Sequence, residues 1–98
     1  MIDLSTETTE NPWFDTLPGP RLKTVLVEKG DALKERYHVT DVYFAYWLHV
    51  LNVNVQRRVH VHFDDLEDWD YWSAYDAGQT PREAAVEMLQ DNGWDIDL

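Results

Sequence analysis

The sequence predicts an α+β fold: a small antiparallel β-sheet of two to three strands, packed against a C-terminal helical hairpin and one N-terminal helix. Three observations lead to this prediction. Apolar residues recur at helical spacing over 21–37, apolar and polar residues alternate over 51–63, and capping residues precede two further segments near 64 and 80. With 98 residues there is room for one core, so we expect one compact domain over 21–98 and an extended arm over 1–20.

The arm over 1–20 begins polar and acidic and then becomes rich in residues that disfavour regular structure, namely Pro12, Pro18, Gly19 and Pro20. It also carries three large apolar side chains, Trp13, Phe14 and Leu17. We expect these side chains to dock the arm onto the core, and an exposed hook for a partner is the alternative.

The segment 21–37 is predicted to be one helix. Its apolar stripe follows three-to-four spacing, and Lys and Arg lie late in the run, as the helix dipole favours. The stripe consists of Leu22, Val25, Leu26, Lys29, Leu33 and Tyr37. Gly30 could instead divide the segment into a short strand over Thr24–Glu28 and a helix from Asp31.

The segment 42–63 is predicted to form the sheet, because it is rich in β-branched and aromatic residues. From Leu51 onward apolar residues alternate with polar ones, as on a half-buried strand. A hairpin turning at 56–58 and one long bent strand both fit this alternation. The stretch 40–48 is ambiguous, because Thr40-Asp41 could equally cap a buried helix.

The C-terminal hairpin is predicted from two helical segments. The first runs over 64–77, capped by Asp64 or Asp65 and ended by Gly78. The second begins at Thr80-Pro81, where Glu83 can complete a capping box, and stops at Asn92-Gly93. Its expected buried face consists of Ala84, Ala85, Met88 and Leu89.

The charge balance excludes several classes of function. Nineteen acidic residues against eight basic ones give a net charge of −11, which disfavours direct binding to nucleic acid and to anionic membranes. The chain has no cysteine, so it can form neither a disulfide nor a thiolate metal site. Polar residues interrupt the longest apolar run, 42–55, and no secretory signal is visible, so we expect a cytoplasmic protein without a membrane span.

One candidate site is a metal centre formed by His60, His62 and Asp64. Alternate residues on a strand project to one face, which places both imidazoles within reach of one divalent ion such as zinc. The string 59–64 resembles the metal-binding string of metallo-β-lactamase-type hydrolases, although Asp65 stands where that family has its next histidine. That fold needs a longer chain, so its activity is not carried over. Solvent-facing polar residues on an amphipathic strand are the alternative.

A second candidate site is the acidic, aromatic segment 64–76, which holds six carboxylates and no basic residue. On a helix, carboxylates three or four residues apart are spaced comparably to the phosphates of a nucleic-acid strand. Such a surface would compete for a basic groove, with aromatic side chains as anchors. The candidate partner-binding residues are Asp64, Asp65, Glu67, Asp68, Asp70, Tyr71 and Asp76. Solvated acids on the outside of a core helix are the alternative.

We therefore expect a non-enzymatic interaction module without a cofactor, whose partner is a basic protein such as a nucleic-acid-processing enzyme. Nuclease-inhibiting immunity proteins, DNA mimics and accessory proteins of phages, plasmids and other mobile elements are of this physical type. A small metal-binding protein or metal-dependent hydrolase is one alternative, and adaptation of an acidic domain to high salt is another. Open sheet edges would also permit a homodimer.

Overall fold

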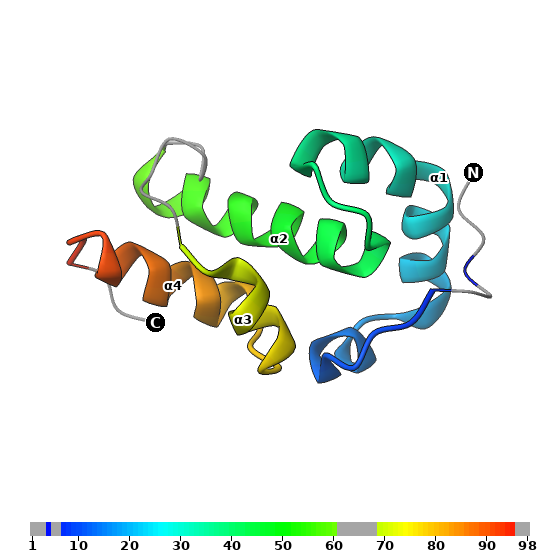
Figure 1. Ribbon diagram of the computed structural model, residues 1–98, viewed down its shortest axis with the longest axis horizontal. Coiled ribbons are helices and arrows are strands. Elements are labelled where there is room, and N and C mark those ends of the chain that lie inside the picture. The colour runs from blue at the N-terminus through cyan, green and yellow to red at the C-terminus, as the bar shows by residue number, and fades with distance from the viewer. Residues whose placement is uncertain (1–3, 5–6, 61–68, 96–98) are drawn as a thin grey trace.

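The computed structural model describes residues 4, 7–60 and 69–95, and all of the regular secondary structure within them is helical. A 3-10 turn, η1 (Pro12–Thr16), precedes four α-helices, which are α1 (Gly19–Tyr37), α2 (Val42–Val59), α3 (Tyr71–Asp76) and α4 (Pro81–Asp91). Figure 1 shows α2 running through the middle of the molecule, with α1 at one end and α3 and α4 along the other. The predicted α+β class is therefore wrong, because no strand occurs in the described part of the chain.

Helix α2 is the element that the sequence prediction assigned to the sheet. Asp41 caps it, since its Oδ1 accepts hydrogen bonds from the backbone N–H groups of Tyr43 (2.9 Å) and Phe44 (3.2 Å). Helices α1, α3 and α4 all contact α2, so its side chains are buried on several faces rather than along one stripe. A helix that is apolar nearly all round gives no helical periodicity, and its valines then resemble those of a strand.

Helix α1 is a single helix, as predicted, and begins two residues earlier than expected. Gly30, which could have divided it, is buried within the helix, so packing compensates for the roughly 1 kcal/mol that glycine costs a helix interior. The helix ends at His38, whose φ of 57° lies in the left-handed region. Its backbone N–H and that of Val39 bond back to the last turn of α1.

Helix α3 is shorter than the predicted helix over 64–77. Trp69 and Asp70 are not helical, and Asp70 is the N-cap. The proposed caps Asp64 and Asp65 lie outside the described residues. Gly78 does end the helix, with φ of 85°, where an added Cβ would lie 3.4 Å from the Pro12 side chain. A left-handed residue beside another segment favours glycine.

Helix α4 confirms the strongest local prediction. Thr80 Oγ1 accepts a hydrogen bond from the Glu83 N–H (3.1 Å), and Glu83 Oε1 accepts one from the Thr80 N–H (3.2 Å), which completes the capping box. The predicted buried face is also correct, because four side chains on it are fully covered, those of Ala84, Ala85, Met88 and Leu89.

The core lies between α2 and the other elements. Trp47 is fully buried at its centre and donates from Nε1 to the Gln79 carbonyl (3.0 Å). Phe14 of η1 is also buried, and Trp13 and Leu17 pack against the same cluster, which confirms that apolar side chains of the arm dock onto the core. No helix among the described residues is both long and apolar enough to cross a membrane.

Candidate functional site

The segment before η1 is bound to the C-terminal end of α3. Asn11 is buried, and its Nδ2 donates to the carbonyls of Tyr75 (2.9 Å) and Gln79 (3.0 Å). Asn11 Oδ1 accepts from the Trp13 N–H (2.9 Å) and so caps η1. Thr9 Oγ1 and the Tyr75 hydroxyl form a further hydrogen bond of 2.5 Å. The bonds to Tyr75 and Gln79 join residues more than sixty positions apart and fix one wall of a surface depression.

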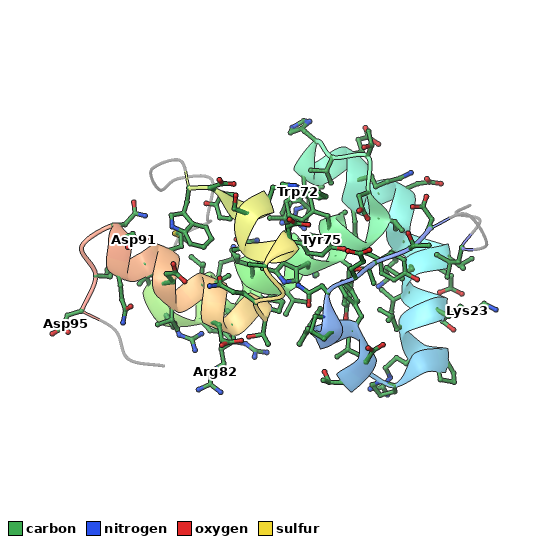
Figure 2. All side chains as sticks on the ribbon, turned by 60° about the horizontal axis from the view of Figure 1, so that its bottom comes forward. Lys23, Trp72, Tyr75, Arg82, Asp91 and Asp95 are labelled. Carbon is green, nitrogen blue, oxygen red and sulfur yellow. The ribbon has the colours of Figure 1, made fainter. Side chains whose placement is uncertain are left out.

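We call this depression the Trp72 groove. It has a volume of about 200 Å³, and its lining residues are Thr8, Thr9, Glu10, Asn11, Asp41, Trp72, Tyr75 and Asp76. Figure 2 shows Trp72 and Tyr75 together on the side of α3 that faces α1 and the N-terminal segment. The N-terminal segment, the N-cap of α2 and α3 thus each contribute to one site.

Trp72 is the aromatic feature of this groove. Half of its side chain is exposed, although it is the kind of large apolar residue that folding normally covers. The rest is held in place by Phe44, whose ring meets the indole edge-on at 5.0 Å, and by the Tyr75 ring at 5.4 Å. The exposed indole is therefore supported from below by the core rather than free to move.

Three carboxylates share the groove with the indole, those of Glu10, Asp41 and Asp76. Glu10 and Asp76 are exposed, and Asp41 is partly buried because it caps α2. No basic residue lines the groove. Carboxylates beside an aromatic face suit a cationic side chain, because the cation can pair with a carboxylate while lying over the ring.

The Tyr75 hydroxyl is held in its neutral form. Burial raises its pKa to about 12, and the charges of Asp41 and Asp76 act in the same direction, whereas the hydrogen bond to Thr9 opposes the change. A neutral hydroxyl at neutral pH keeps the bond to Thr9 and cannot act as a base there. The groove therefore presents carboxylate charge and an aromatic face.

Within the described part of the chain, two of the predicted partner-binding acids line different depressions. Asp76 lines the Trp72 groove, whereas Asp70 lines a different depression together with Glu87. Asp70 is engaged as the N-cap of α3, because its carboxylate accepts from the Ser73 N–H (3.0 Å) and Oγ (2.6 Å), and these bonds lower its pKa. Tyr71 packs against the core, edge-on to Trp69. The remaining predicted residues, Asp64, Asp65, Glu67 and Asp68, lie outside the described residues.

The predicted metal centre requires His60 to lie on a strand, but in the structure His60 follows helix α2. Val59 ends α2, and His60 is its C-cap in the left-handed region, with φ of 59°. The alternation that would place His60 beside His62 therefore does not begin at this residue. His62 and Asp64 lie outside the described residues, and among the described ones no group of three potential ligands converges.

Sequence reasoning missed Glu10, Asp41 and Trp72 as members of one site. Asp41 was expected only as a helix cap, and Trp72 only as one of the aromatic residues of 64–76, either an anchor or part of the core. The groove arises from the long-range bonds of Asn11 and Thr9, for which no local pattern exists in the sequence. No protein-family model, curated protein or solved structure gives a significant match to this chain, so the site is interpreted from its own geometry.

Proposed function

We propose that this protein is a non-enzymatic interaction module that binds a basic protein partner through the Trp72 groove. The observation that carries the proposal is a half-exposed tryptophan, held by the core, beside three carboxylates and no base. A lysine or arginine side chain of the partner would enter the groove, lie over the indole and pair with Asp76 or Glu10.

The net charge of −11 supports the same proposal at longer range. An acidic protein is steered toward a basic cleft, which raises the association rate, and an anchoring aromatic residue then limits dissociation. A basic cleft that normally binds nucleic acid is the kind of surface this combination fits. The protein would then mask that cleft in the manner of a DNA mimic or an immunity protein.

The first test is capture of partners from the native host with tagged wild-type protein and paired variants. Trp72→Ala removes the exposed indole, and Trp94→Ala is its control because Trp94 is similarly exposed (41%) but follows α4. Asp76→Asn removes one groove carboxylate, and Asp95→Asn is its control. Figure 2 shows Asp95 at one end of the molecule, away from Trp72, which lies near its middle.

We expect a basic protein to be retained by the wild type and by both controls, and to be lost from Trp72→Ala and Asp76→Asn. Association with the purified partner should slow as salt is raised, because added ions screen the attraction. Nucleic acid should compete with this protein for the basic cleft of the partner. Equal retention by all five proteins, or association that is insensitive to salt, would contradict the proposal.

A further inference from the structure

A second groove lies between α1 and α2, on surfaces that the Trp72 groove does not use. Its volume is about 550 Å³, within the range of ligand-binding clefts. The residues that line this α1–α2 groove are Val25, Lys29, Ala32, Leu33, Arg36, Tyr46, His49, Val50, Val53, Asn54 and Arg57.

Each helix presents one continuous stripe to this groove. The α1 residues run from Val25 to Arg36 and the α2 residues from Tyr46 to Arg57, both at the three-to-four spacing of a single helical face. Each stripe is about 16 Å long at 1.5 Å per residue. The groove is therefore an elongated trough between two helices, with a floor that is mainly apolar.

The charge of this groove is opposite to that of the whole chain. Lys29, Arg36 and Arg57 line it and are exposed, and no carboxylate does so, although the chain has only eight basic residues against nineteen acids. Among the described residues none forms an ion pair with these three cations. Arg36 is held over the Tyr37 ring, with its guanidinium carbon 5.5 Å from the ring centre. Burial, followed by the charges of Arg36 and Lys29, lowers the pKa of His49 inside the groove.

The spacing of the cations indicates the kind of ligand. Lys29 and Arg36 are two helical turns apart, about 10 Å along α1, so a single carboxylate cannot pair with both. A ligand with several carboxylates and one apolar face matches the trough, and an amphipathic acidic helix has that form. A second copy of this chain, related by two-fold symmetry through the same groove, would set cations against cations.

We propose that the α1–α2 groove is a docking site for an acidic amphipathic helix of a partner protein. The apolar face of that helix packs on Val25, Val50 and Val53, which are partly exposed, and its carboxylates pair with Lys29, Arg36 and Arg57. This site is independent of the Trp72 groove, so the two proposals stand or fall separately. Together the sites would give the molecule one surface for a basic partner and one for an acidic segment.

The test uses a synthetic helical peptide with leucines along one face and glutamates seven residues apart beside it. Its affinity for the full chain is measured by fluorescence anisotropy, in parallel with a peptide in which glutamine replaces every glutamate. We expect the glutamate peptide to bind, and the Lys29→Gln/Arg36→Gln variant to bind it about tenfold more weakly through loss of two charge pairs. Val53→Glu puts a carboxylate on the groove floor, and this variant alone should also bind the glutamate peptide more weakly than the wild type does.

The matched control is Lys23→Gln/Arg82→Gln, which removes the same charge from two positions outside the groove. Figure 2 shows Lys23 on the outer side of α1 and Arg82 on α4. We expect this control and Trp72→Ala to bind the glutamate peptide as the wild type does, with circular dichroism confirming that every variant is folded. The proposal is overturned if the wild type does not bind the peptide, if the glutamine peptide binds equally well, or if the groove variants match the control. Tighter binding of laurate or of a single-stranded oligonucleotide would also overturn it, in favour of a monocarboxylate or a nucleic acid.

Discussion

The side-chain amide of Asn11 is buried, and both its nitrogen and its oxygen form hydrogen bonds. Its two N–H groups reach the carbonyl of Tyr75 in α3 and that of Gln79 in the loop between α3 and α4, and its oxygen accepts from Trp13 at the start of η1. A buried amide with these partners ties the N-terminal segment to α3, together with the Thr9–Tyr75 hydrogen bond and the packing of Phe14 against Tyr75. Asn11 therefore positions the wall of the Trp72 groove, although it contributes no charge to it.

Replacing Asn11 tests this role directly. Asn11→Ala should lower the free energy of unfolding by about 2 kcal/mol, because it leaves the Trp13 N–H without its acceptor and opens a small gap. Asn11→Asp keeps that acceptor but sets a carboxylate against two carbonyl oxygens, so it should cost more at neutral pH and less at acidic pH. Urea unfolding at both pH values measures the difference. Wild-type stability of Asn11→Asp would show that the two donated bonds contribute nothing.

Tyr75 gives the protein a distinct response to alkaline pH. Its pKa is about 12 in the folded protein against 10.0 for an unperturbed tyrosine, so between these values the unfolded chain has released the proton and the folded one retains it. The free energy of unfolding should then fall as pH rises from 10 to about 12. Tyr75→Phe should lose less stability than the wild type between pH 10 and about 12. Urea unfolding of both proteins over this pH range measures the difference. Parallel curves for the two proteins would contradict the assignment.

Among the elements, α2 decides the fold, and its register can be checked by substitution. Leu51 is fully buried in the core, whereas Val53 is partly exposed and lines the α1–α2 groove. Leu51→Ala should cost about 2 to 5 kcal/mol and Val53→Ala about 1 kcal/mol or less. In the strand predicted from the sequence both residues would lie on the same buried face. Similar losses in denaturant unfolding would therefore support a strand and contradict the helix.

Elements with local signals were predictable from the sequence, and the central one was not. Two of these signals are local: the capping box of Thr80 and Glu83 and the apolar stripe of α1. Each involves residues close in sequence, so it does not depend on how the rest of the chain packs. Helix α2 is buried by three other helices, and this removes the one-sided pattern on which a helix assignment depends. The alternation of Leu51, Val53 and Val55 with polar residues, and the β-branched valines themselves, then favoured a strand.

The sequence predicted which residue types the candidate site combines, acidic and aromatic, but not which segments supply them. That acidic and aromatic residues would act together was inferred from the sequence, and Asp76 belongs to both the predicted and the observed set. The other carboxylates come from distant segments. Glu10 is held near α3 by the bonds of Asn11 and Thr9, and Asp41 by the packing of α2 against α3. Asp70, by contrast, faces a different depression, since capping α3 fixes its direction.

For the molecule as a whole, the net charge of −11 predicts how stability depends on salt. Self-repulsion among the acids should be screened as salt rises to a few tenths molar, where the Debye length is below about 10 Å. The free energy of unfolding should therefore rise and then level off. Thermal unfolding across a salt series measures this. A rise that continues to molar salt would favour adaptation to a saline habitat over a partner-directed role for the charge.

The bonds from Asn11 to Tyr75 and Gln79 also determine when the Trp72 groove can exist during synthesis. A ribosome makes Glu10 and Asp41 early, but their neighbours Trp72 and Asp76 and the carbonyls that fix Asn11 come only after most of the described chain. A nascent chain therefore exposes acidic residues long before it has a groove. Under the proposed function, binding competence would arrive in one step, once α3 has been made, and a chain interrupted before α3 would not compete for the partner.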